Sequence, residues 1–360
     1  MRALWIVNSP DRPMAATIIG LQAKGVEVHV MCPGNAPRFK TLKAAGISMI
    51  DFAPRRSIEL RAIRKMRAEL RRKDYDILHV FGNRAITNAI LAAHKMPVHL
   101  ITYRGIVGNL SFLDPIAWAR YLNPRIDRIV CVAEAVRRFF LDMRPAFLRV
   151  PPGRLVTIYK GHDLNWYRDQ PADLSQLGIP PDAFVIGCVA NIRPRKGIEV
   201  LVDAAGRLVP ELNVHLLLVG NMDSAALRER IEASPARRRI HLAGFRADAP
   251  ALMAACDVFV LPSLRREGLP RAVIEAMAYR TPPIVTNCGG SPELVEDGVS
   301  GLVVPPGDDG AIANAVRKLA ADPAVREDMG EAARERIRLH FNIENTIRKT
   351  LELYQAVLAA

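Results

Sequence analysis

The sequence predicts an α/β protein made of two doubly wound parallel-sheet domains, and two observations carry this prediction. Short apolar segments recur about every 20 to 30 residues along the chain and alternate with segments of helical periodicity. Such alternation is typical of βαβ units, whose parallel sheets are covered by helices on both faces. A chain of 360 residues is also long enough to build two hydrophobic cores.

The first half supplies the first predicted domain. Its expected strands cover residues 2–7, 27–32, 48–52, 76–81, 99–103, 128–132 and 155–159, with helical stretches such as 15–24 and 58–72 between them. After Trp166 the pattern loosens into the polar, proline-bearing sequence YRDQPADLSQLGIPPDAF. Proline and polar residues between periodic segments indicate a linker, so we expect the first domain to span residues 1–168.

The second half repeats the pattern. Its expected strands cover residues 185–190, 215–219, 241–244, 258–261, 283–286 and 302–304, and its helices include 317–321 and 326–340. We expect a second domain over residues 169–340 and a C-terminal helix within 341–360 that packs back on the first domain. Two such domains would enclose a cleft, and ligands of open parallel sheets bind beyond the carboxyl ends of the strands.

Composition narrows the class of protein. Half of the residues are hydrophobic, yet no apolar run reaches the roughly 18 residues of a membrane-spanning helix, and the start lacks the features of a signal peptide. The five cysteines are scattered, odd in number and mostly inside apolar strands, without metal-ligand spacing. We therefore expect buried, reduced thiols in a cytoplasmic protein.

Charge is distributed unevenly between the halves. Residues 1–168 hold 28 lysines and arginines against 12 aspartates and glutamates, a balance of +16, whereas the remainder carries −3. A nucleic acid, an anionic membrane surface and an acidic substrate are each compatible with such an excess. Because the chain shows no nucleic-acid-binding motif and few aromatic residues among its cations, we expect no nucleic-acid partner.

A segment near the middle of the second half predicts an anion site. Residues 258–290 read VFVLPSLRREGLPRAVIEAMAYRTPPIVTNCGG: a strand, a polar loop, a helix opened by Pro270, a second strand and a glycine pair. Proline suits the first helical turn, where a missing N–H has no consequence, and the free N–H groups beside it favour a phosphate. Glu275 lies more than one turn into this helix, where it would reach hydroxyls of the same ligand. These features together predict a nucleotide or nucleotide-sugar site.

Three further strand-end loops are compatible with the same site. The loop VANIRPRKG at residues 189–197 carries Arg193, Arg195 and Lys196, which would either clamp a diphosphate or form a solvated basic turn. The glycine pair before Ser291 would allow a ligand to approach closely or simply form a turn, with Glu293 favoured at a helix start. Gly220 and Ser263 follow strands in the same way.

Several motifs of the second half, in this order, resemble one family. They are YKGHD (159–163), ANIRPRKG (190–197), LLLVG (216–220), HLAGF (241–245), CDVFVLPS (256–263), EGLPRAVIEAMA (267–278), GGSPE (289–293) and DGVSGLVVPPGD (297–308). The chain resembles the retaining nucleotide-sugar glycosyltransferases of GT-B fold, family 4, over residues 155–340. The two glutamates with seven residues between them, Glu267 and Glu275, match the signature of that family.

The resemblance implies roles for residues at matching positions. Glu275 would bind the ribose hydroxyls, Glu267 would approach the donor sugar, and Arg193 and Lys196 would hold the diphosphate. The rest of the implied donor site consists of Arg195, Gly220, Ser263, Gly268, Leu269 and Pro270. The resemblance also implies that no metal or other cofactor is needed, because cations and a helix end stabilise the leaving diphosphate, with UDP or GDP as the nucleotide.

The first half departs further from the family. The loop after its first strand, residues 8–12, has no glycine where many members carry a pair, and residues 102–105 lack the histidine that many carry. Arg12 and Arg104 would either contact the acceptor or be surface residues. We expect His79 to pack within the sheet, and His162 and Asp163 to match a hinge element that shapes the cleft.

Two segments of this half are candidates for contact with anionic lipid. In IELRAIRKMRAELRRK (58–73), Ile58, Ile63, Met66 and Leu70 form an apolar stripe flanked by cations, which fits a helix docked on the sheet. In VRRFFLDMR (136–144), Phe139 lies beside Phe140 among arginines, a composition suited to a membrane interface. An acidic acceptor would produce the same charge pattern.

We therefore expect a retaining transferase that moves a sugar to a hydroxyl of a lipid-linked, lipopolysaccharide or polysaccharide acceptor at the inner face of the cytoplasmic membrane. A GT-B nucleotide-sugar epimerase is one alternative, and a non-catalytic nucleotide-sugar-binding protein is the other. The sequence does not indicate the sugar, the base, the acceptor or the oligomeric state.

Overall fold

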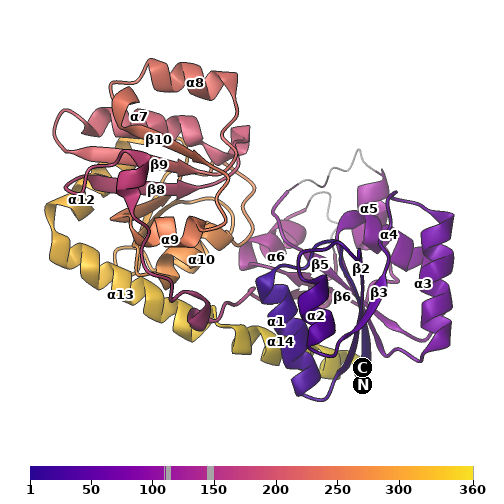
Figure 1. Cartoon of the computed structure of the whole chain (residues 1–360). Helices are drawn as coiled ribbons and strands as arrows, with labels where there is room; N and C mark the ends of the chain where they lie inside the picture. The colour runs from indigo at the N-terminus through magenta and orange to yellow at the C-terminus, as the bar shows by residue number, and fades with distance from the viewer. Residues whose placement is uncertain (109, 111–114, 144–149, 360) are drawn as a thin grey trace. The chain divides into compact units, whose positions relative to one another are not determined.

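The structure of the chain is a computed structural model that describes residues 1–108, 110, 115–143 and 150–359. It contains two compact units, the first made of Met1–Gly161 with Phe341–Ala360 and the second of His162–His340 (Figure 1). The chain leaves the first unit at Gly161 and enters the second at His162, before the boundary expected at residue 168. The reason is that Tyr167 belongs to the second unit, where its ring packs on Tyr279 with centroids 5.6 Å apart.

The first unit is built on a seven-stranded parallel sheet of order β3-β2-β1-β4-β5-β6-β7. Its strands are β1 (Arg2–Ile6), β2 (Glu27–Cys32), β3 (Ser48–Asp51), β4 (Ile77–Phe81), β5 (His99–Arg104), β6 (Arg128–Cys131) and β7 (Leu155–Thr157). These strands coincide, to within a residue or two at their ends, with the apolar segments that predicted them.

Helices cover both faces of this sheet (Figure 1). They are α1 (Arg12–Ala23), α2 (Phe39–Ala44), α3 (Leu60–Arg72), α4 (Asn83–Ala92), α5 (Pro115–Leu122), α6 (Glu134–Leu141) and the C-terminal α14 (Ile343–Leu358). Helix α14 packs against α1 so closely that a Cβ on Gly20 would lie 2.2 Å from Cδ1 of Ile347. At its start, Thr346 accepts a hydrogen bond of 2.8 Å from the backbone N–H of Gly161. The last helix is therefore an integral part of the first unit.

The second unit contains a six-stranded parallel sheet of order β10-β9-β8-β11-β12-β13. Its strands are β8 (Phe184–Val189), β9 (Val214–Val219), β10 (Ile240–Gly244), β11 (Val258–Leu261), β12 (Pro283–Thr286) and β13 (Leu302–Val304). Its helices are α7 (Ile198–Leu208), α8 (Ala225–Glu232), α9 (Ala249–Ala254), α10 (Arg271–Ala278), α11 (Ser291–Leu294), α12 (Asp309–Ala321) and α13 (Pro323–His340). The predicted fold class, two parallel α/β sheets, is confirmed.

The two sheets share a strand order that places a ligand crevice in each. In both, the first strand has the second on one side and the fourth on the other: β1 lies between β2 and β4, and β8 between β9 and β11. The chain thus changes direction between the first and fourth strands, and loops leaving their carboxyl ends diverge to opposite faces. This topological switch point is where open α/β sheets bind ligands. The loops after β1 and β4, and those after β8 and β11, are therefore the expected ligand-binding positions.

Several local expectations need correction. Helix α3 begins at Leu60, so Ile58 lies outside it and its residue is 58% exposed, although Met66 and Leu70 are buried as the apolar stripe predicts. Phe140 is fully buried and packs on Tyr121, with ring centroids 5.6 Å apart, so it belongs to the core and not to a membrane-facing surface. Arg144, the last residue of that candidate segment, lies outside the described residues.

Candidate donor site in the second unit

Two loops meet at the switch point of the second unit, residues 190–197 after β8 and residues 262–270 after β11. The backbone N–H of Leu264 donates to the carbonyl of Arg195 at 2.8 Å, and the Arg195 guanidinium donates to the carbonyl of Arg266 at 3.0 Å. Gly197 has a φ of 64°, and a Cβ there would lie 2.2 Å from the carbonyl oxygen of Pro262. The glycine that ends the basic loop is thus required for the two loops to approach each other.

A buried charge pair joins the two loops. Nζ of Lys196 lies 2.6 Å from Oε1 of Glu267, and Oγ of Ser263 donates to the same carboxylate oxygen at 2.6 Å. The two charged side chains are only 17% and 7% exposed. Ser263, which the sequence analysis places in the donor site, is fully buried and orients Glu267. The pair therefore fixes an ammonium and a carboxylate at the switch point of the second unit.

The Glu267 segment is held in an uncommon conformation. Arg266 has a φ of 64°, a left-handed value that disfavours non-glycine residues, and such strain is found most often at functional sites. Gly289 lies behind the segment, where a Cβ would be 2.2 Å from the Glu267 carbonyl oxygen. Thr286 donates through Oγ1 to the carbonyl of Ser263 at 2.5 Å. Packing against the protein's own backbone accounts for Gly289, without a ligand that approaches it.

Helix α10 starts directly after this loop. The sequence predicts Pro270 inside the first turn of this helix, but the structure places it at the N-cap, one residue earlier. Among the described residues, the backbone N–H groups of Arg271 and Ala272 have no acceptor, which leaves two donors at the positive end of the helix. Glu275 lies farther along the helix, with Oε1 3.2 Å from the Arg271 guanidinium, and its side chain is largely buried. The helix start retains the chemistry of an anion site.

The remaining predicted residues of this site differ in their accessibility. Arg193 is exposed, and its guanidinium has no hydrogen bond or ion pair with a described residue. Gly220 has a φ of 122°, and a Cβ there would lie 2.1 Å from the carbonyl oxygen of Ala190, so it allows the loops after β8 and β9 to touch. Gly268 is buried and Leu269 is half-buried. Arg193 is thus the predicted cation with the greatest freedom to reach a ligand.

Sequence reasoning missed two contributors to this arrangement. Thr286 fixes the carbonyl of Ser263, and Arg271 pairs with Glu275. The pairing of Arg271 could have been anticipated, because residues four apart on a helix are neighbours. Thr286 comes from a different strand, so only the tertiary structure places it here.

In the first unit, the two arginines proposed for the acceptor side have different positions. Arg104 is buried, and its guanidinium donates to the carbonyls of Ile106 and Gly108 and to the hydroxyl of Tyr121. It is therefore a structural side chain that shapes the loop after β5, and not a surface residue. Arg12 is exposed at the first position of α1, after the N-cap Asp11.

His79 lies inside the sheet of the first unit, as expected. Its Nδ1 is 2.8 Å from the hydroxyl of Tyr354 on α14, and burial lowers the pKa of the imidazole to about 3. All five cysteines are free thiols in buried positions, and burial raises the pKa of Cys188 to about 12. Burial thus favours the neutral form of both groups.

Two family models together cover most of the chain. The model of the glycosyl transferases group 1 matches residues 169–336, and that of glycosyltransferase family 4 matches residues 14–166. The chain belongs to glycosyltransferase family 4. The resemblance read from the motifs of the second half is thereby confirmed, and it extends to the first half, where those motifs are absent.

Curated relatives agree with this assignment. An alpha-maltose-1-phosphate synthase of Mycolicibacterium smegmatis is 30% identical over 252 residues, which are 65% of this chain and 64% of the synthase. The match thus spans less than two thirds of that relative. A lipopolysaccharide core biosynthesis mannosyltransferase of Rhizobium leguminosarum is 26% identical over 78% of both chains.

Solved structures show the same fold over the whole chain. A glycosyltransferase of Rickettsia africae superposes with a TM-score of 0.85 at 19% identity, covering 99% of this chain and 98% of that one. Anabaena HepE, solved in complex with UDP-glucose, has a TM-score of 0.80 at 23% identity and covers 99% and 100% of the two chains. The fold of this family-4 chain is accordingly GT-B.

Proposed function

We propose that this chain transfers a sugar from a nucleotide diphospho-sugar to a hydroxyl of a lipid-linked, lipopolysaccharide or polysaccharide acceptor, with retention of anomeric configuration. The observation that carries the proposal is the Lys196–Glu267 pair, a buried ammonium and carboxylate fixed 2.6 Å apart at the switch point of the second unit. A binding site for an anionic, hydroxyl-rich ligand needs a fixed cation and a fixed hydrogen-bond acceptor. The family to which the chain belongs supports the same reading.

The second unit would bind the donor. Lys196 and the exposed Arg193 would hold the diphosphate, whose remaining oxygens would accept from the free N–H groups at the start of α10. Glu275 would accept hydrogen bonds from the ribose hydroxyls, and Glu267 would do the same for the donor sugar. Arg195, which ties the two loops together, would act as a positioning residue.

The chemistry would proceed on one face of the donor sugar. The bond between the anomeric carbon and the diphosphate oxygen breaks, and its electron pair leaves with the diphosphate, whose charge Lys196 and Arg193 stabilise. The acceptor hydroxyl oxygen bonds to the anomeric carbon on the same face, and its proton passes to the departing phosphate oxygen. No protein nucleophile takes part, so Glu267 would act through hydrogen bonding and charge.

Two relatives guide the choice of substrates. The Rhizobium protein is a mannosyltransferase of the lipopolysaccharide core, and the Anabaena structure contains UDP-glucose. We accordingly propose UDP- or GDP-sugars as donors and an envelope saccharide as acceptor. An epimerase would need acid and base side chains at the sugar, and the buried pair offers one carboxylate that already accepts two hydrogen bonds.

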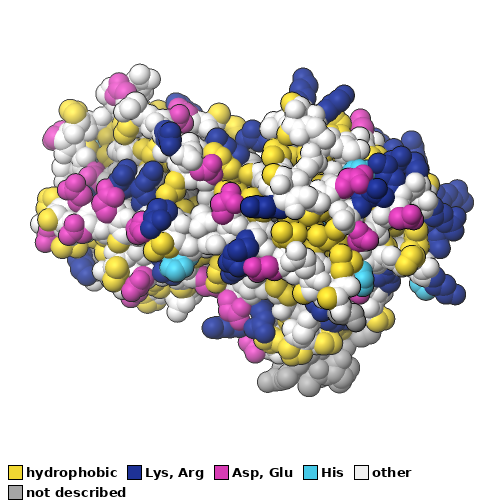
Figure 2. All heavy atoms as spheres, turned by 90° about the horizontal axis from the view of Figure 1, so that it is seen from below, with side chains coloured by type: hydrophobic (Ala, Val, Ile, Leu, Met, Phe, Trp, Pro, Cys, Tyr) yellow, Lys and Arg dark blue, Asp and Glu magenta, His cyan; other side chains and the backbone are white. Residues whose placement is uncertain are grey.

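We also propose that the protein works in the cytoplasm, bound peripherally to anionic lipid through its first unit. Figure 2 shows lysine and arginine side chains gathered at the right of the view, over the end of the first unit where α3 lies. Helix α3 carries arginines and Lys65 over its exposed face, and two apolar residues at and just before its start, Leu60 and Ile58, are 67% and 58% exposed. Cations around exposed apolar residues favour an interfacial position. None of the described helices has the length and hydrophobicity to cross a bilayer.

Calorimetry with UDP, GDP and ADP tests the donor assignment. We expect one of the three to bind the wild-type protein, and binding to weaken in Lys196→Met, because the diphosphate loses its fixed cation. If none of the three binds, the transferase proposal is wrong. Mass spectrometry of products formed from a panel of nucleotide sugars and a lipid extract would then name the sugar and the acceptor.

A further inference from the structure

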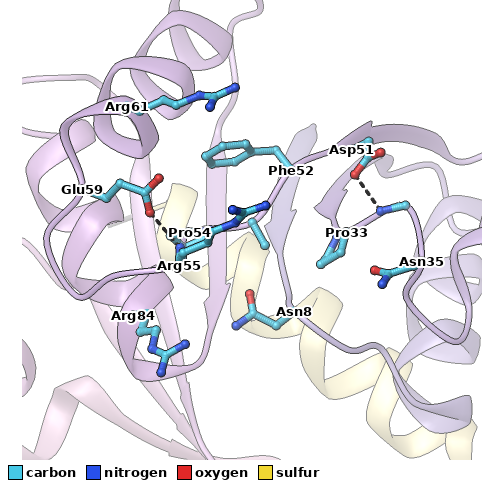
Figure 3. Close-up of a pocket in the computed structure, with 12 residues that line it drawn as sticks. Asn8, Pro33, Asn35, Asp51, Phe52, Pro54, Arg55, Glu59, Arg61 and Arg84 are labelled. Atoms are coloured by element: carbon cyan, nitrogen blue, oxygen red, sulfur yellow. Dashed lines mark hydrogen bonds between the residues drawn. The ribbon is translucent and has the colours of Figure 1, made fainter.

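The first unit has its own open pocket at its switch point. The pocket, of about 730 Å³, lies beyond the carboxyl ends of β1 to β4, and its volume falls in the range of roughly 300–1,000 Å³ typical of small-molecule sites. Figure 3 shows Arg55, Arg61 and Arg84 on one side, from the segment before α3, from α3 and from the start of α4. Pro33 and Asp51 lie on the opposite side. The described lining includes none of the donor- or acceptor-site residues proposed from the sequence, although Glu59 and Arg61 belong to the segment 58–73 considered for lipid contact.

The two carboxylates of this pocket are occupied by the backbone. Asp51 accepts from the N–H of Gly34 at 2.6 Å, and Glu59 accepts from the N–H groups of Arg55 and Arg56 at 2.7 and 3.3 Å. The bond from Arg55 leads the causes that lower the pKa of Glu59, so this carboxylate is charged at neutral pH. These acidic groups therefore shape the loops by hydrogen bonding to N–H groups. The charge of Arg55 also lowers the pKa of Glu59, but neither carboxylate forms an ion pair with a pocket arginine in the described part of the chain.

The three arginine side chains are exposed and have no described partner. Arg55, Arg61 and Arg84 make no side-chain hydrogen bond or ion pair with the part of the chain that the structure describes. Other arginines of the same unit are tied to carboxylates, such as Arg72 to Glu69 and Arg125 to Asp127.

Lys65 adds a further cation beside the pocket, with Nζ 4.6 Å from the centroid of the Phe52 ring. Phe52 itself lines the pocket. Nζ of Lys65 also donates to the carbonyl of Asp51 at 3.3 Å, whereas the three arginines make no such bond with a described residue. Cations with free donors around a concave surface are suited to an anionic ligand.

We propose that this pocket binds a phosphate group of the acceptor, so that the acceptor class is a phosphorylated saccharide. Guanidinium groups from three separate segments match a tetrahedral dianion with three free oxygens better than a carboxylate, which one arginine can satisfy. Sugar hydroxyls would bind the side chain of Asn8 and the second oxygens of Asp51 and Glu59. The apolar face of a sugar would pack on the ring of Phe52. This inference rests on the proposed function, because it assigns the acceptor side of the same reaction.

The test measures phosphate binding while UDP saturates the donor site. Inorganic phosphate and vesicles of phosphatidylcholine with phosphatidic acid are titrated into the full chain, and pure phosphatidylcholine vesicles serve as the blank. The variant is Arg55→Gln with Arg61→Gln and Arg84→Gln. The matched control is Lys24→Gln with Lys40→Gln and Lys43→Gln, three exposed cations of the same unit that lie neither on α3 nor in the pocket lining.

We expect the triple pocket variant to bind phosphate at least about thirtyfold more weakly than the wild type. Each single substitution should weaken phosphate binding about tenfold, the lower end of the effect of losing one hydrogen bond to a charged group. The control should stay within about twofold. Tighter binding to the phosphatidic acid vesicles than to inorganic phosphate would identify the ligand as a lipid-linked phosphate. Equal affinity for the two would identify it as a soluble phosphate. Unchanged binding in the pocket variant, an equal loss in the control, or no phosphate binding at all would overturn the inference.

The same samples keep the two proposals apart. UDP binding reports on the second unit alone, and the pocket variant should retain it. If UDP binds and phosphate does not, the acceptor inference fails while the donor proposal stands. If no nucleotide binds, the donor proposal fails, whatever the phosphate titration shows.

Discussion

The two switch points of this protein use charge in opposite ways. In the second unit, Lys196, Glu267 and Ser263 form a buried network in which each group already has a partner. In the first unit, Arg55, Arg61 and Arg84 surround an open pocket without described partners. The same strand order thus supports a pre-organised site in one unit and an open, cationic site in the other. A closed network suits one exact ligand geometry, whereas free guanidinium groups suit a ligand that arrives with its own charge.

The largest effect should follow removal of the ammonium from the closed site. Lys196→Met should lower kcat/KM for the nucleotide-sugar donor by about 100- to 1,000-fold, the range for loss of one preorganised donor at a developing charge. Steady-state kinetics with the donor found by the nucleotide panel measures it. The matched control is Lys318→Met, an exposed lysine on α12 of the same unit, which should leave the rate unchanged.

A second variant separates this effect from unfolding. Lys196→Met with Glu267→Gln removes both charges, so that no carboxylate stays buried without its cation. We expect this double variant to keep its circular dichroism spectrum and to remain inactive. Activity near the wild-type level in either variant would remove Lys196 from the site.

The comparison also predicts a difference in stability. Glu267→Ala leaves Lys196 and Ser263 without their acceptor in a buried position, and breaking such a pair costs about 3–5 kcal/mol. Arg84→Ala removes a charge without a described partner, so its effect should stay within about 0.5 kcal/mol. Urea unfolding of the nucleotide-free protein measures both. Equal costs for the two substitutions would mean that the contrast between the sites has no energetic basis.

A smaller effect should come from the edge of the closed site. Glu275→Gln should weaken nucleotide binding about tenfold, because a charged acceptor of ribose hydroxyls becomes neutral. Arg271→Gln is the matched control, since it removes the other member of the helical pair and leaves the carboxylate in place. If Glu275 only pairs with Arg271 on the helix surface, calorimetry will show no change for Glu275→Gln, and the ribose assignment is then wrong.

The sequence predicted the strands of both sheets because each is a short apolar segment between helical ones, and this pattern is local. Lys196, Glu267 and Glu275 could be proposed for the donor site because their loops carry the motifs of a family. The sequence could not predict the pocket of the first unit. Arg55 and Arg84 belong to no motif, and Arg61 is part of the basic segment considered for lipid contact. Arg84 follows β4, so it joins the loops after β1, β2 and β3 at this pocket only because β1 lies between β2 and β4. The burial of Ser263 was not predictable for a related reason: Thr286, which donates to its carbonyl, comes from the following strand.

The smallest expected effect concerns the exposed cations of the first unit. Vesicles containing anionic lipid should sediment with the protein at low salt, and binding should fall several-fold as salt rises from about 0.05 to 0.5 M, because exposed charges are screened within about 10 Å at 0.1 M. Ile58→Ser with Leu60→Ser should weaken the part of the binding that persists at high salt, since these exposed side chains supply the apolar contact. Val299→Ser in the second unit, also an exposed apolar residue, is the matched control. Binding that is indifferent to salt, or equal loss in the control, would mean that the positive charge of the first unit serves the acceptor phosphate alone and not a membrane surface.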